Sequence, residues 1–199
     1  MDKLLMFFYN IIPGSLFLIG LQSITHISIY SLREPDWIYK AIIFSFFLGL
    51  AFQEITKFIR KNFGFDQSTW ENVSEKRDKK SFEIACKTLV KWKLIEWKKG
   101  KKMDKKELKK AFYLMHNFIG IKRDSGAGYI GQKTAFWFNI AIGAFFLGII
   151  VYAYNCICSL FLITFSVLTW KFIALELHKA LYDTVLKTFV TNTVAQSTK

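Results

Sequence analysis

Two long apolar segments limit the possible folds of this chain more than any other feature. Leu4–Leu21 contains only Asn10 and Ser15 as strongly polar residues, and Ala135–Tyr154 contains only Asn139. Eighteen helical residues extend about 27 Å, close to the hydrocarbon thickness of a bilayer. With 52% hydrophobic residues and 21 Phe among its 199 residues, the chain carries more apolar surface than a soluble domain easily buries. We therefore expect an integral membrane protein whose first span is a retained anchor.

Two further segments, Trp37–Ile55 and Cys156–Leu175, complete a set of four predicted spans. Trp37–Ile55 is the weaker of the two, because Lys40 and Glu54 leave an uninterrupted apolar core of only twelve residues, 41–52. Both charged side chains can extend toward water from the ends of a span. The Cys156–Leu175 segment follows the third span after one short turn, which predicts a tight antiparallel hairpin.

The distribution of charge predicts the orientation in the membrane. The segment Lys57–Lys133 holds 21 of the 28 Lys and Arg residues against nine Asp and Glu, a net charge of +12. Arg33 is the one Arg between the first two spans. The excess of positive charge on cytoplasmic loops places Lys57–Lys133 inside the cell, and four spans then place both termini inside as well. The Lys-, Ile- and Phe-rich composition is consistent with an AT-rich bacterial genome, so we expect the bacterial inner membrane.

The predicted fold class is all-α. It is an integral membrane protein with four transmembrane helices and a basic helical cytoplasmic insert between the second and the third. The predicted segments are a first transmembrane pair over residues 1–56, the insert over 57–133, a second transmembrane hairpin over 134–178 and a cytoplasmic helical tail over 179–199.

Helical spacing of apolar residues predicts two helices in the insert. The first begins at Asp78 or Ser81 and runs to about Trp97, although residues 90–97 also alternate as a short hairpin would. Asp104 followed by an acid three residues later resembles a capping box that begins the second helix. The expected apolar positions of the two helices are Phe82, Ala85, Leu89, Trp92, Leu108, Phe112, Met115 and Ile119.

The tail and the glycine-rich segment before the third span carry further expectations. We expect the fourth span to continue as a helix to Val190, and Thr191–Lys199 to be frayed. Residues 126–131 match the pattern G-x-G-x-x-G, but no strand precedes them, as a dinucleotide site requires. A flexible joint is the favoured interpretation, and a backbone nest for a lipid phosphate is the alternative.

A run of lysines in the insert is the strongest candidate for a binding surface. It can be a solvated face that enforces topology, a surface for anionic lipid, or a surface for nucleic acid beside Trp92 and Trp97. Lysine greatly outnumbers arginine, which favours non-specific attraction over base reading. The candidate anion-binding residues are Lys98, Lys99, Lys101, Lys102, Lys105, Lys106, Lys109, Lys110, Lys122 and Arg123.

A second group of candidates lies inside the predicted spans. Pro13 removes a helix hydrogen bond and Gly14 lowers the cost of a bend, so the first span has a packing kink or a hinge. If the protein conducts, the few polar side chains of the spans are expected on the wet face. The pore-lining or hinge candidates are Asn10, Pro13, Gly14, Gln53, Glu54, Asn139 and Thr164.

Catalytic and metal chemistry are not indicated. None of the three His residues has a partner at metal-ligand spacing, and there is no Cys-His cluster. We find no nucleophile with a base and no carboxylate pair. We therefore expect no enzyme, no cofactor, no metal and no small-molecule substrate.

The plan of the chain resembles a known group of membrane proteins. The similarity lies in the length, the first span bearing Asn10-x-x-Pro13-Gly14, the basic insert Lys57–Lys133 and the closing hairpin around Asn155. On these points the chain resembles the four-pass accessory membrane proteins encoded beside RNA-targeting type VI-B CRISPR effectors. The resemblance implies an antiviral accessory role, with a CRISPR nuclease or RNA as partner.

Two hypotheses on function follow. In the first, a non-enzymatic inner-membrane protein forms a homo-oligomer that makes or gates a pore, is regulated through its basic cytoplasmic module and acts in antiviral defence. Four short helices can hardly enclose a channel alone, so this hypothesis requires several copies. In the second, the spans anchor a regulatory module that recruits RNA, a nucleoprotein or anionic lipid through its lysines. Membrane lipids are expected partners in both.

Overall fold

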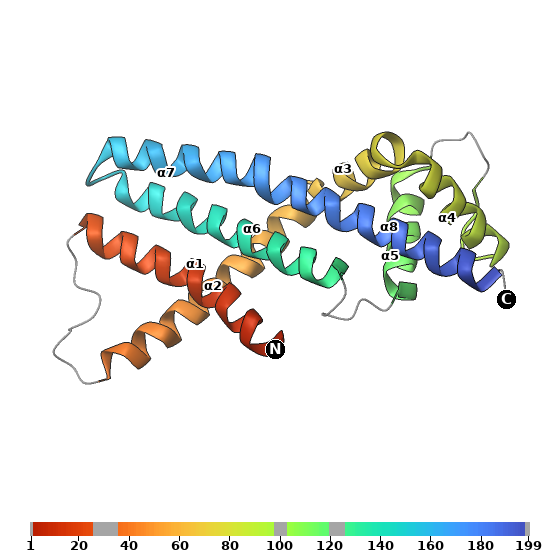
Figure 1. Ribbon diagram of the computed structural model, residues 1–199. Coiled ribbons are helices and arrows are strands. Elements are labelled where there is room, and N and C mark those ends of the chain that lie inside the picture. Colours follow the sequence, from red (N-terminus) through yellow and green to blue (C-terminus); the bar gives the residue numbers. More distant parts are fainter. Residues whose placement is uncertain (1, 26–35, 98–102, 120–125, 198–199) are drawn as a thin grey trace. The chain divides into compact units, whose positions relative to one another are not determined.

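The computed structural model describes residues 2–25, 36–97, 103–119 and 126–197, and each regular element in these ranges is a helix (Figure 1). The all-α prediction is confirmed. The chain divides into two compact units. We call Met1–Asn62 with Gln132–Glu176 the membrane unit, and Phe63–Gly131 with Leu177–Lys199 the helical module.

Four helices are long and apolar enough to cross a membrane, as predicted. They begin with α1 (Asp2–Thr25), α2 (Trp37–Asn62) and α6 (Gly126–Val151). The fourth begins with α7 (Cys156–Leu168) and continues without a break through the π-helical segment η2 (Thr169–Ala174) into α8 (Leu175–Ser197). Large apolar side chains such as Leu16, Phe47 and Phe161 are exposed on α1, α2 and α7, as lipid-facing surfaces require.

Helices α1 and α2 pack closely through two glycines. A Cβ atom added at Gly14 would overlap the backbone oxygen of Ser45, and one added at Gly49 would overlap the backbone oxygen of Asn10. Each glycine therefore faces the backbone of the other helix. Small residues at helix contacts in a membrane allow backbones to approach in this way.

Helices α6 and α7 form the predicted antiparallel hairpin (Figure 1). The side chain of Asn155 accepts a hydrogen bond from the Cys158 backbone N–H at 3.0 Å and so caps α7. Along the hairpin, Ser159 and Ser166 are buried. Their hydroxyls donate to the backbone oxygens of Gly148 and Ala141, each at 2.7 Å.

The helical module consists of α3 (Phe65–Asn72), the π-helical η1 (Val73–Arg77), α4 (Lys79–Lys91), α5 (Lys105–Ile119) and nearly all of α8. Its core combines apolar side chains from the insert and the tail. Buried members of this core are Val73, Phe82, Ala85, Cys86, Leu89, Leu108, Ala111, Phe112, Met115, Val185, Leu186 and Phe189. The tail is thus an integral part of the module core.

Several predicted boundaries are wrong. Helix α2 continues beyond Ile55 to Asn62, and α4 ends at Lys91 because Lys93 has a positive φ of 58°. Residues 92–97 therefore neither continue the helix nor form a hairpin.

Two expected breaks in the chain are also absent. The glycine-rich residues from Gly126 onward form the first turns of α6, where we expected a flexible joint. The tail, expected to fray from Thr191, remains helical to Ser197. Thr193 is buried, and its hydroxyl donates to the backbone oxygen of Phe189 at 3.0 Å.

Candidate functional site

The α5 helix presents a surface of exposed lysines. Its N-terminus is capped by Asp104, whose carboxylate accepts a hydrogen bond from the Glu107 backbone N–H at 2.7 Å. This is the cap predicted from the sequence. The surface consists of Lys105, Lys106, Lys109 and Lys110, all exposed, with Tyr113 among them at 65% exposure. We call these five residues the α5 lysine face.

The opposite side of α5 lies in the module core. Leu108, Ala111, Phe112 and Met115 are buried there. The Phe112 ring stacks on Phe82 of α4, with 5.8 Å between ring centroids and 22° between ring planes. Because packing involves this apolar side alone, the four lysines are not needed to hold the helix in place.

Helix α4 packs against α5, and its N-terminus is held by a side-chain cap. The Asp78 carboxylate accepts a hydrogen bond from the Ser81 backbone N–H at 3.1 Å, which confirms the first of the two predicted caps. Cys86 lies on the buried side of α4. Burial, with a smaller contribution from Glu83, raises the pKa of its thiol to about 12. A thiol with so high a pKa is a packing group and a poor nucleophile at neutral pH.

Helix α8 closes the module from the other end of the sequence. His178 is fully buried, and its Nε2 lies 2.8 Å from Oδ1 of Asp66 on α3. Its ring meets Tyr182 edge-on, with 5.0 Å between centroids. Further along α8, Phe189 packs against Phe118 of α5 at 5.2 Å.

The sequence analysis missed the contact between His178 and Asp66. The two residues are 112 positions apart and belong to no spacing motif. The apolar spacing of Val185, Leu186 and Phe189 was the one available signal that α8 has a buried side.

An ion pair lies on the surface of α8 in the helical module. Lys187 Nζ lies 2.9 Å from Oδ2 of Asp183, one turn earlier on α8. The hydrogen bond from Asp183 raises the pKa of Lys187. The Lys187 side chain is 58% exposed, so the pair contributes little to the stability of the module.

Six of the ten candidate anion-binding residues lie outside the described residues: Lys98, Lys99, Lys101, Lys102, Lys122 and Arg123. The structure therefore brings together four of the ten on one side of α5. It adds Tyr113, which the sequence analysis did not select.

The polar residues predicted to line a pore lie mainly in helix contacts. Asn10 and Asn139 are buried within the membrane unit, as is Pro13. Gly14 is in the close contact between α1 and α2. In this arrangement these four residues pack helices together.

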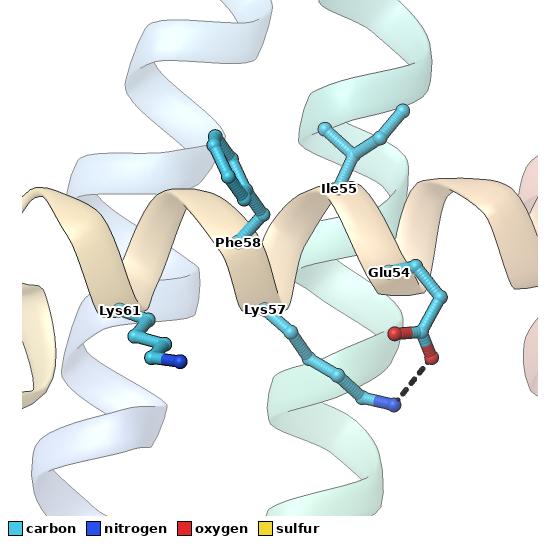
Figure 2. Close-up of a pocket in the computed structure, with 5 residues that line it drawn as sticks. All are labelled: Glu54, Ile55, Lys57, Phe58 and Lys61. Atoms are coloured by element: carbon cyan, nitrogen blue, oxygen red, sulfur yellow. Dashed lines mark hydrogen bonds and ion pairs between the residues drawn. The ribbon is translucent and has the colours of Figure 1, made fainter.

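The remaining pore candidates are more accessible. Thr164 is exposed on α7, and Gln53 is half-buried on α2. Glu54 is exposed, and Oε1 of its carboxylate lies 2.6 Å from Lys57 Nζ on the same helix (Figure 2). Among the described residues, no group of three His, Cys, Asp or Glu side chains could hold a metal ion.

Comparisons with known proteins give no relative. No family model, no curated protein and no solved structure matches the chain. The candidate function is therefore inferred from the residues and structure of this chain.

Proposed function

We propose that the chain is a membrane-anchored binding protein whose helical module recruits RNA or a ribonucleoprotein to the inner face of the membrane. The observation that supports this proposal is the α5 lysine face. Four exposed cations are followed, one turn later, by an exposed tyrosine on a helix whose opposite side is fixed in a core. Because the packing of α5 does not need these side chains, they are available for the capture of a polyanion.

The chemistry of the face suits a single-stranded nucleic acid. Lysine ammonium groups neutralise backbone phosphates and release condensed counterions, without reading the bases. An exposed tyrosine adds a ring on which any base can stack. Such binding is tolerant of sequence, as expected for a lysine-rich surface. The resemblance to CRISPR accessory proteins would make an RNA-guided nuclease complex a natural cargo.

The test is binding of labelled single-stranded RNA to the full-length protein in detergent micelles at several salt concentrations. If the four lysines each pair with a phosphate, neutralising them changes the slope of log K against log salt by about 2.8. The test variant replaces Lys105, Lys106, Lys109 and Lys110 by glutamine.

The matched control removes the same charge from α4, by replacing the exposed Lys79, Lys80, Lys87 and Lys91 with glutamine. We expect the α5 variant to lose the salt-dependent binding and the α4 variant to keep most of it. Equal losses would show that total charge, and not this face, governs binding. Binding of anionic vesicles with no binding of RNA would replace RNA by a lipid surface as the partner.

A second candidate function is a pore made by several copies in a role in defence. The observation that favours it is the short apolar run of α2 between Lys40 and Gln53, which covers residues 41–52. Twelve helical residues extend about 18 Å, less than the roughly 30 Å of a hydrocarbon core, and such a mismatch favours self-association. Mass measurement in detergent and ion flux from liposomes test this candidate. A monomer that leaves liposomes ion-tight would exclude it.

A further inference from the structure

The exposed side of α2 contains a shallow hollow near the end of the apolar run. Its volume is about 490 Å³, and its walls are Glu54, Ile55, Lys57, Phe58 and Lys61 (Figure 2). These residues all belong to α2 and lie just beyond the apolar residues 41–52. The hollow therefore lies where a span passes from hydrocarbon to headgroups.

The hollow has a basic side and an apolar side. Figure 2 shows Lys57 and Lys61 extending to one side of α2 and Ile55 and Phe58 extending to the other. Lys57 and Lys61 are one helical turn apart, so their ammonium groups can share one anion. Phe58 is 66% exposed, which leaves a large apolar ring available to an acyl chain.

The charge of the hollow sets the charge of its ligand. Two lysines and Glu54 give a formal net charge of +1. The Glu54 carboxylate lies 2.6 Å from Lys57 Nζ, so it disfavours a ligand with several negative charges. The nearby Arg60 is directed elsewhere, since its guanidinium carbon lies 5.4 Å from the centre of the Phe138 ring. A phosphodiester headgroup with a net charge of −1, and no cationic group of its own, matches this arrangement.

We infer that the hollow is a binding site for an anionic phospholipid. The headgroup phosphate lies between Lys57 and Lys61, and an acyl chain runs along Ile55 and Phe58. Free phosphate matches the lysines but leaves the apolar wall uncovered, so the lipid is favoured over the free anion. This site is in the membrane unit and is independent of the α5 lysine face, so either proposal can fail without the other.

The experiment uses the full-length protein in detergent, titrated with phosphatidylglycerol or phosphatidylcholine, with bound lipid counted by native mass spectrometry. At the usual attraction of about 1 kcal/mol per basic residue, the net charge of +1 gives a preference of about 5-fold for the anionic lipid. The double variant Lys57→Gln and Lys61→Gln is expected to lose this preference.

A control variant comes from the other end of the same helix. Lys40→Gln removes a lysine that is paired one turn away with Asp36, at 3.2 Å, and it should leave the preference unchanged. Phe58→Ala should weaken binding of both lipids. Equal retention of the two lipids by the unaltered protein would overturn the proposal. Displacement of phosphatidylglycerol by millimolar inorganic phosphate would overturn it too, because the site would then recognise a bare anion.

Discussion

Replacing Gly49 by alanine should weaken the contact between α1 and α2. The new Cβ would lie 2.6 Å from the carbonyl carbon of Asn10 and still closer to its oxygen. Carbon atoms in contact are normally about 3.5–4.0 Å apart, so the two helices would have to separate by roughly 1 Å. The clashing atoms belong to the backbone, so no side chain can rotate to relieve the overlap.

The magnitude follows from two opposing effects. Overpacking of this kind costs about 1–3 kcal/mol, whereas alanine in place of glycine favours a helix by up to about 1 kcal/mol. Gly131→Ala is the matched control, because its Cβ would meet Leu181 methyl groups at an ordinary 3.8 Å. The control gains the same helix propensity without the clash. The difference in unfolding free energy between the two variants therefore isolates the overpacking.

The assay is unfolding of the purified protein in mild detergent, by heat or by a denaturing detergent, followed by circular dichroism. We expect Gly49→Ala to be less stable than Gly131→Ala by about 1–3 kcal/mol. Gly14→Ala, which faces the backbone of Ser45, should behave like Gly49→Ala. Equal stability of Gly49→Ala and the control would refute the close contact between the two backbones.

Further predictions concern cysteine reactivity and buried polar groups. Cys156 is exposed and Cys86 is buried, so a membrane-impermeant maleimide added to intact cells should label Cys156, if the proposed orientation holds; no labelling before lysis would count against that orientation. With its pKa raised to about 12, Cys86 in purified protein should react more rapidly with each pH step well beyond 9, and a plateau near pH 9 would contradict its burial. Removal of the buried His178 ring by alanine should destabilise the module by about 2–4 kcal/mol in thermal unfolding, with a smaller loss for Asp66→Asn, which keeps the shape of the side chain. Ser166→Ala should cost about 0.6–1.7 kcal/mol, and an unchanged unfolding midpoint would show that its hydroxyl contributes nothing.

The spans could be predicted from the sequence because hydropathy is a local property. An apolar run such as Ala135–Tyr154 can be recognised without knowing any contact to another segment. The helix caps are local in the same way, because the carboxylates of Asp78 and Asp104 accept hydrogen bonds from amides three positions away. Boundaries were less predictable, since the end of α4 depends on the left-handed backbone at Lys93.

Contacts between distant segments could not be predicted. Gly14 was interpreted as part of a bend with Pro13, whereas its position is set by the approach of Ser45 on another helix. The apolar side of α5 was predicted from the spacing of Leu108, Phe112 and Met115, but the residues that cover it, such as Phe82 of α4, were not. The hollow on α2 depends on which side of that helix is left uncovered, which charge and spacing do not specify.

The π-helical segment η2 determines which residues at this end of the membrane unit share a buried side. Thr169 and Ala174, the first and last residues of η2, are both buried although they are five positions apart. Five residues of an α-helix turn through about 500°, which would separate the two side chains by roughly 140° around the axis. The wider turn of η2 accommodates the additional residue between them. A single-residue deletion between these two positions would leave a spacing of four, at which an ordinary α-helix keeps both side chains on one face.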